Sequence, residues 1–214
     1  MANLVSLSRL PLLFLLIWLA YMPLGIAQIV AMLLLIVVFV MDAIDGSIAR
    51  RRGEVSPLGA VLDIAVDRVV ELGMWFVLVD LGAAPLWAAL VFVVRGALVD
   101  AMRAARLSDE GVAPFDAFEH PLARWIVKGR FMRGFYAAIK AIAFCWLLFF
   151  LPMPVLLAER APALWASVAP FAQGIGQALV WLVVAVCVLR GLPDLLEYPR
   201  RMRAQLRRQP GAAR

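Results

Sequence analysis

The sequence predicts an all-α integral membrane protein, a bundle of six transmembrane helices with both termini on the cytoplasmic side. The chain of 214 residues is 64% hydrophobic and only 17% charged, whereas soluble domains are about half apolar and a quarter charged. Several apolar runs approach the roughly 20 residues that a helix needs to cross a bilayer. These runs are continuous rather than alternating, so they favour helices over the strands of a closed barrel.

The first two spans are separated by a break within one long uncharged run. No charged residue occurs from Leu10 to Met41, and a single helix over that run would be roughly 48 Å long, too long for one span. Pro23 and Gly25 supply the break. Arg9, within the first span, is expected to extend its side chain to the membrane interface.

Short turns and one longer polar segment separate the remaining spans. The sequence DLGAAP predicts a tight turn between spans three and four, and PMPVLLAERAPA predicts a loop between spans five and six. Residues 106–130 form the polar connection between spans four and five. The chain 1–214 is expected to be a single membrane-embedded domain with a basic cytoplasmic tail from about residue 190. The six spans are expected near residues 5–22, 24–48, 58–81, 86–105, 131–151 and 164–189.

The distribution of basic residues predicts the orientation. Six spans put both termini and the loops 50–56 and 106–130 on one side, and these segments are rich in arginine, whereas the opposite loops contain Arg160 alone. Positively charged loops stay in the cytoplasm. We therefore expect a multi-pass protein of the cell membrane. The net charge of +6 fits this bias and contact with lipid headgroups, and no nucleic-acid partner is expected.

Four aspartates lie toward the cytoplasmic ends of spans two and three. Asp42 and Asp45 are three residues apart, and Asp63 and Asp67 are four apart, so each pair shares one face of a helix. A short loop makes the two spans antiparallel neighbours, so the four carboxylates can converge. Like charges at that distance repel, and a site of carboxylates without histidine suits hard ions such as Mg²⁺ or Mn²⁺. The alternative is an ion-pair network that only clamps the helices.

Two glycines and an arginine accompany the acids at helical spacing. Gly46 follows the second aspartate, and Gly59 lies one turn before Asp63. The missing side chains let a ligand or a neighbouring helix approach the backbone. Arg50 lies one turn after Gly46, where its guanidinium can pair with the acids or with a substrate phosphate.

This pattern resembles the CDP-alcohol phosphatidyltransferase family, which carries D-x2-D-G-x2-A-R-x8-G-x3-D-x3-D. Every element and every gap of that pattern occurs over 26 residues of this chain. The predicted six-span layout with a cytoplasmic N-terminus is also the family's. The matching residues are Asp42, Asp45, Gly46, Ala49, Arg50, Gly59, Asp63 and Asp67.

The resemblance implies a phospholipid-synthesising enzyme that transfers a phosphatidyl group from CDP-diacylglycerol to a small polar alcohol and releases CMP. It implies that two divalent cations, Mg²⁺ or Mn²⁺, are held by Asp42, Asp45, Asp63 and Asp67. Asp67 would also act as the general base on the acceptor hydroxyl. A homodimer is implied as well. The CDP-binding residues would be Gly46, Ala49, Arg50 and Gly59.

Cues to the acceptor conflict. Arg68, directly after the last aspartate, resembles the inositol and inositol phosphate branches, and Ile64 and Arg68 depart from the glycerol 3-phosphate branch. The sequence WIVKGR nevertheless resembles that glycerol 3-phosphate branch. ARR followed by SPLG resembles the choline and ethanolamine enzymes, and serine is a further alternative. The acceptor therefore stays open, with inositol, inositol phosphate or glycerol 3-phosphate favoured.

Basic residues near the cytoplasmic end could bind a phosphorylated acceptor, although they also fit the ordinary cytoplasmic bias. Arg95 falls inside span four and needs an acid or a phosphate, with Asp100 and Glu71 as structural candidates. A cation transporter is the rival function, but it favours acids at mid-membrane and repeat symmetry. The candidate acceptor-binding residues are Arg95, Arg103, Lys128, Arg130 and Arg133.

Overall fold

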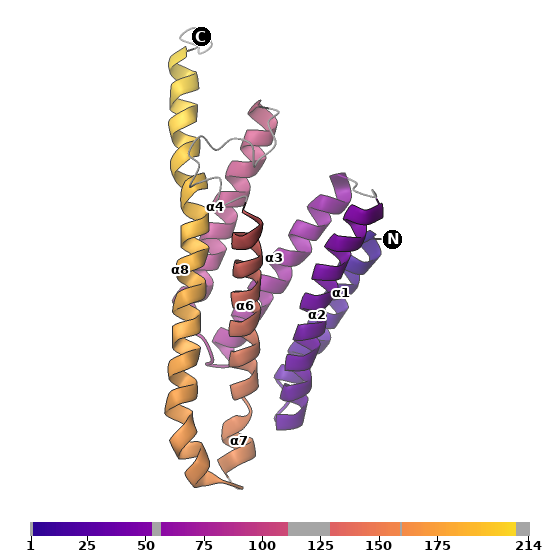
Figure 1. The fold of residues 1–214 in the computed structure, drawn as a ribbon, viewed down its shortest axis with the longest axis vertical. Helices are drawn as coiled ribbons and strands as arrows, with labels where there is room; N and C mark the ends of the chain where they lie inside the picture. The colour runs from indigo at the N-terminus through magenta and orange to yellow at the C-terminus, as the bar shows by residue number, and fades with distance from the viewer. Residues whose placement is uncertain (1, 53–56, 111–128, 159, 209–214) are drawn as a thin grey trace. The chain divides into compact units, whose positions relative to one another are not determined.

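The computed structural model is helical, as the composition predicts (Figure 1). It describes the backbone of residues 2–52, 57–110, 129–158 and 160–208, and the side chains of residues 6–44, 59, 61–102, 129, 131–157 and 160–196. Among these residues there is no strand, which confirms the all-α prediction. The helices are α1 (Ala2–Ala20), α2 (Gly25–Arg52), α3 (Pro57–Asp80), α4 (Leu86–Glu110), α6 (Arg130–Phe150), α7 (Met153–Ala158) and α8 (Pro162–Arg208).

The chain divides into two compact units, each assembled from separate stretches of sequence. The first unit comprises Met1–Ala89 and Ile139–Trp181, and the second comprises Leu90–Ala138 and Leu182–Arg214. Helices α4, α6 and α8 each contribute to both units.

In the first unit, α1 lies against both α2 and α3 (Figure 1). The buried positions of α1 follow a helical period, because Leu13, Leu16 and Ala20 lie on one stripe and are almost completely buried. Trp75 of α3 is also fully buried, and its ring meets that of Phe144 in α6 edge-on at 5.1 Å between centroids. Such aromatic contacts add to the burial of apolar surface that holds these helices together.

The turn between α3 and α4 shows why the sequence DLGAAP ends a helix. Gly82 has φ of 71°, a left-handed conformation that glycine adopts without steric cost. Its amide donates to the carbonyl of Val79 at 3.0 Å, and the amide of Ala83 donates to Leu78 at 2.8 Å. These two bonds form a Schellman motif that satisfies the last carbonyls of α3. The predicted turn is confirmed.

Gly25 allows α2 to begin close to α7. A Cβ atom added at Gly25 would lie 2.6 Å from the side chain of Leu156, closer than two carbon atoms can pack without a shift of one of them. The residue predicted as a helix break therefore also provides a close contact between helices.

In the second unit, Gly191 of α8 allows a similarly close approach by α4. A Cβ atom at Gly191 would lie 2.9 Å from Cγ of Arg95. The neighbouring Arg190 lies over the ring of Tyr136 in α6, 5.0 Å from its centroid, within range of a cation–π interaction.

Three stretches among the described residues are long and apolar enough to span a membrane: Gly25–Ile44, Phe131–Leu157 and Pro162–Leu196. Ser6–Ala20 is a shorter apolar helix. Helices α3 and α4 fall outside this set because ionisable residues interrupt them, including Asp63, Asp67 and Arg95. The structure thus supports a membrane protein.

Two predicted connections turn out to be helical. The segment 153–158, expected as part of a loop, forms α7, because proline is compatible with the first turn of a helix and Pro154 lies there. The basic segment after residue 189, expected as a tail, continues α8 to Arg208. Residues 190–208 contain many leucines and arginines, which are strong helix formers, and the helix continues through them although Gly191, Pro193 and Pro199 also lie in this segment.

Candidate active site

Three of the four predicted acids converge in the first unit. Asp42 comes from α2, and Asp63 and Asp67 come from adjacent turns of α3. One carboxylate oxygen from each lies within 4.8 Å of the other two. We call these three residues the aspartate cluster. The helical spacing that predicted shared faces therefore brings the carboxylates together across two helices.

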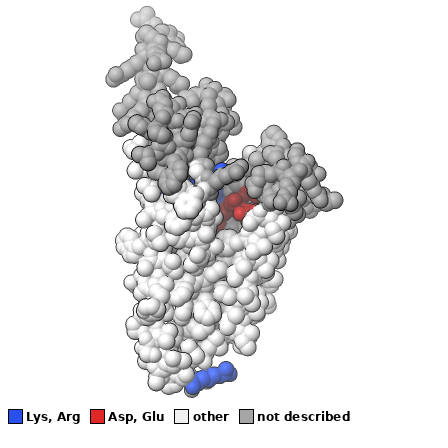
Figure 2. Space-filling model, viewed as in Figure 1, with Lys and Arg blue, Asp and Glu red and all other residues white. Residues whose placement is uncertain are grey.

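The aspartate cluster is open to its surroundings. The side chains of Asp42, Asp63 and Asp67 are 41%, 45% and 49% exposed. In Figure 2 acidic atoms gather at one place on the face in view, and the described part of that face is otherwise mostly uncharged. A ligand can therefore reach these carboxylates.

The other motif residues are placed only by their backbone. Asp45, Gly46, Ala49 and Arg50 all lie within the continuous helix α2, although their side chains are outside the described set. Asp45 is one turn from Asp42 on that helix, as predicted. Gly59 lies in α3 one turn before Asp63.

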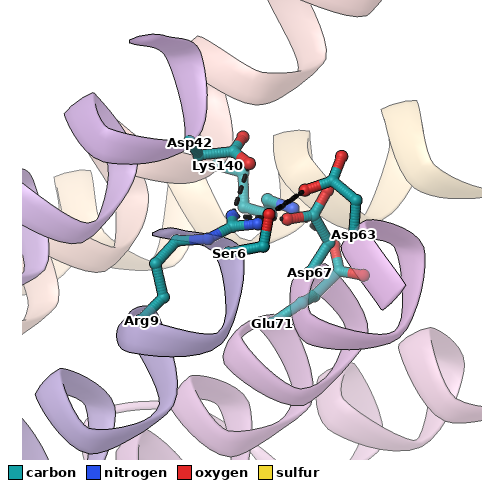
Figure 3. A network of polar contacts seen from close by, with 7 residues as sticks. All are labelled: Ser6, Arg9, Asp42, Asp63, Asp67, Glu71 and Lys140. Atoms are coloured by element: carbon teal, nitrogen blue, oxygen red, sulfur yellow. Dashed lines mark hydrogen bonds and ion pairs between the residues drawn. The ribbon is translucent and has the colours of Figure 1, made fainter. Parts of the chain in front are cut away.

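Arg9 of α1 joins the aspartate cluster, a contact that was not predicted from the sequence. Its guanidinium donates to Oδ1 of Asp63 at 2.7 Å and to Oδ1 of Asp67 at 2.8 Å, and it also pairs with Asp42 (Figure 3). Ser6, one turn earlier, lies 3.4 Å from Oδ1 of Asp63. The Arg9 residue is only 1% exposed.

The side chain of Arg9 is thus buried against the three carboxylates, and its depth relative to a membrane interface stays a prediction. A charge buried inside a protein needs opposite charges nearby, and the packing of α1 against α2 and α3 provides three of them. The available signal was that Arg9 is the only charged side chain before Asp42. A lone charge in an apolar segment indicates a buried partner.

A second polar cluster lies one turn further along α3. Glu71 is 4% exposed and accepts a hydrogen bond from Lys140 of α6 at 2.7 Å and one from Arg68 at 2.7 Å. We call these three residues the Glu71 cluster. Glu71 was proposed from sequence as a partner of Arg95, and the structure instead shows it paired with Lys140 and Arg68. Lys140 was overlooked, although it is the only charge between Arg133 and Glu159.

The predicted acceptor-binding residues are not brought to the aspartate cluster by any described contact. All five belong to the second unit or to residues outside the described set. Arg95 lies against Gly191, and its buried Nε has no hydrogen-bond partner among the described residues. Arg133 is exposed on α6, Arg103 and Arg130 are described by their backbone alone, and Lys128 is outside the described residues. The acceptor site stays a prediction.

The donor set of the aspartate cluster fits a hard divalent cation. Three carboxylates within 4.8 Å of one another offer only oxygen ligands, which Mg²⁺ and Mn²⁺ favour. Arg9 neutralises part of the charge of the three carboxylates, so an attraction for cations remains. The side chain of Asp45 lies outside the described set, so its predicted part in the metal site stays a prediction.

The described residues thus form an all-helical, apolar chain in which carboxylates from two helices cluster, which supports a membrane protein with a candidate metal site. Comparison with known proteins identifies the family. The family model for CDP-alcohol phosphatidyltransferases matches residues 1–189, so the chain belongs to the CDP-alcohol phosphatidyltransferase family.

Two curated proteins are similar to parts of the chain. An archaetidylinositol phosphate synthase of Aeropyrum pernix is 41% identical over 46 residues, which are 22% of this chain and 24% of that protein. A cardiolipin synthase (CMP-forming) of Streptomyces coelicolor is 36% identical over 100 residues, which are 45% of this chain and 46% of that protein. The chain thus spans about a quarter and about half of the lengths of these relatives.

Proposed function

We propose that this protein is a membrane enzyme that transfers a phosphatidyl group from CDP-diacylglycerol to an alcohol and releases CMP. The observation that carries the proposal is the convergence of Asp42, Asp63 and Asp67 from two helices. Their spacing in the sequence is that of the family motif, and the family model covers most of the chain. The reaction would form a step of phospholipid synthesis.

In this reaction the acceptor hydroxyl oxygen forms a bond to the phosphorus that carries the diacylglycerol, and the bond from that phosphorus to CMP breaks. Two divalent cations, held by the aspartate cluster and Asp45, would supply positive charge to the diphosphate and to the leaving CMP. Asp67 would accept the proton of the hydroxyl. A carboxylate is a weak base for an alcohol, so the positioning of both substrates must supply much of the acceleration.

The CDP moiety would lie along the motif residues of α2 and the start of α3. Gly46 and Gly59 would leave room at the backbone, and Arg50 would pair with a phosphate. Because the carboxylates are about half exposed, both a lipid and a water-soluble substrate can approach them.

The acceptor alcohol is proposed to be inositol, inositol phosphate or glycerol 3-phosphate, with serine, choline and ethanolamine as alternatives. The name of the archaeal relative contains inositol phosphate. The Streptomyces relative is named for cardiolipin and the release of CMP, so phosphatidylglycerol belongs in any acceptor panel. The predicted acceptor-binding residues are Arg95, Arg103, Lys128, Arg130 and Arg133.

We further propose a single membrane domain with six spans, both termini in the cytoplasm and the aspartate cluster at the cytoplasmic end, functioning as a homodimer in the cell membrane. Reporter fusions at the N-terminus, after Arg208 and in the turn at Gly82 would test the orientation. Cytoplasmic signals at both ends and an outer signal at Gly82 are expected. An outer signal at either end would overturn this orientation.

The enzyme proposal is tested with purified protein, labelled CDP-diacylglycerol and Mn²⁺. With the acceptor panel described above, CMP release is expected with at least one alcohol. A folded protein that releases no CMP with any alcohol of a wide panel would overturn the proposal. Transport of cations without CMP release would instead favour the alternative hypothesis that the protein is a cation transporter.

A further inference from the structure

Arg9 contacts the same carboxylates that the proposed metal site would use. Its side chain is 2% exposed, whereas the three aspartates around it are 41–49% exposed. Each aspartate directs Oδ1 to the guanidinium. The arginine is therefore the buried member of the cluster, and the carboxylates that converge on its guanidinium (Figure 3) are the partly exposed members.

The orientation of Arg9 is set by the carboxylates rather than by its other donors. Its Nε is buried and has no hydrogen-bond partner among the described residues, and a buried N–H without a partner is unfavourable. Both terminal nitrogens of the guanidinium instead contact carboxyl oxygens, and hydrogen bonds from a charged donor are the stronger ones, so these contacts maintain the orientation.

One guanidinium cannot neutralise three carboxylates. The three oxygens lie within 4.8 Å of one another, a separation at which like charges repel. Arg9 reduces this repulsion and thereby holds Asp42 of α2 beside Asp63 and Asp67 of α3. It also lowers the negative potential that a divalent cation would meet at the same oxygens.

We propose that Arg9 is a positioning residue that preassembles the aspartate cluster and limits its affinity for divalent cations, because the guanidinium and the ions draw on the same carboxylate oxygens. The inference rests on the proposed function, which supplies the divalent ions. By this inference α1, which lies outside the family motif, contributes a residue that orders the metal site. Removing the positive charge should make the cluster less stable alone and more strongly attractive to Mn²⁺.

The test compares Arg9→Gln with the parent protein, and the measured quantity is the dissociation constant for Mn²⁺, followed by the EPR signal of the free ion. We expect Arg9→Gln to bind Mn²⁺ about tenfold more tightly, equivalent to about 1.4 kcal/mol. Its melting temperature should be below that of the parent in chelator and should rise more on addition of Mn²⁺. Arg9→Lys keeps the charge and should bind Mn²⁺ like the parent.

Lys140→Gln is the matched control, because it removes one positive charge from the neighbouring Glu71 cluster. Equal tightening in Lys140→Gln and Arg9→Gln would show a long-range charge effect and overturn the proposal. Unchanged or weaker Mn²⁺ binding by folded Arg9→Gln would also overturn it. If the parent protein binds no Mn²⁺, this inference fails together with the metal site of the proposed function. CMP release is measured in a separate assay. Mn²⁺ binding without CMP release would therefore contradict the enzyme proposal alone.

Discussion

The aspartate cluster and the Glu71 cluster meet on consecutive turns of α3, at Asp67 and Glu71, and they balance charge in opposite ways. In the first, three carboxylates share one guanidinium, and the acids are about half exposed. In the second, the carboxylate of the buried Glu71 is shared by two cations. An excess of open carboxylates can bind cations, whereas a buried acid surrounded by bases is already satisfied. Charge balance and exposure therefore distinguish a candidate ligand site from a structural ion pair.

The largest effect is expected when one acid of the aspartate cluster is removed. Asp67→Asn keeps the size of the side chain but removes both a ligand charge and the proposed base. Loss of a general base alone lowers turnover about 10²–10⁴-fold, and we expect at least that loss in the rate of CMP release. Binding of CDP-diacylglycerol should be largely retained.

Asp80→Asn is the matched control, because Asp80 is an exposed acid at the opposite end of the same helix. This variant should release CMP at the rate of the parent. If Asp67→Asn keeps the turnover of the parent, Asp67 is not the general base. The aspartate cluster would then be a structural ion-pair network, like the Glu71 cluster.

The Glu71 cluster should respond in stability rather than in metal binding. Glu71→Gln leaves Lys140 and Arg68 without this carboxylate, and loss of one partner of a buried pair costs roughly 3 kcal/mol or more. Denaturation in detergent should show this loss of unfolding free energy, while the dissociation constant for Mn²⁺ stays that of the parent.

A double variant, Glu71→Gln with Lys140→Met, separates pairing from packing. Removing both charges should restore part of the lost stability, because the unpaired cation causes much of the penalty. A change in Mn²⁺ affinity in Glu71→Gln as large as that in Asp67→Asn would contradict the assignment of this cluster to structure.

Removal of divalent ions should affect the two clusters unequally. A ligand at one hundred times its dissociation constant stabilises the folded state by about 2.7 kcal/mol. The parent protein should therefore melt at a lower temperature in chelator than with excess Mn²⁺. Glu71→Gln should show the same difference between the two conditions, and Asp63→Asn should show almost none. An equal difference in Asp63→Asn would place the stabilising ion elsewhere.

The sequence predicted the shared helix face of Asp63 and Asp67 because helical spacing is local and can be read from the chain. Their approach to Asp42 of α2 also depends on α1, which lies against both helices and carries the Arg9 that contacts all three carboxylates. The contacts of Arg9 and Lys140 depend on how α1 and α6 pack against α3, which no local period specifies. Each of these residues is a lone charge in an apolar segment, which predicts a buried partner but does not indicate which residue that partner is.

Helix ends were predicted less well than helix positions, for a similar reason. Helix α7 begins beside prolines that were taken as loop residues, yet proline is compatible with the first turn of a helix. Helix α8 runs beyond its apolar part because strong helix formers continue there. Hydropathy predicts which segment of a helix can be buried in a membrane or a protein core. It gives little information on the residue at which the backbone hydrogen bonds of that helix end.

The smallest effect is expected at Ser6, and it gives the finest test of how the aspartate cluster is held. The hydroxyl of Ser6 lies 3.4 Å from Oδ1 of Asp63, a long contact beside an oxygen that Arg9 already contacts at 2.7 Å. A typical intramolecular hydrogen bond contributes about 1 kcal/mol, and a long one contributes less. Ser6→Ala should therefore change Mn²⁺ affinity by less than about twofold, measured as for Arg9→Gln. A tenfold change would mean that the hydroxyl orients Asp63, and that α1 controls the cluster through Ser6 as well as through Arg9.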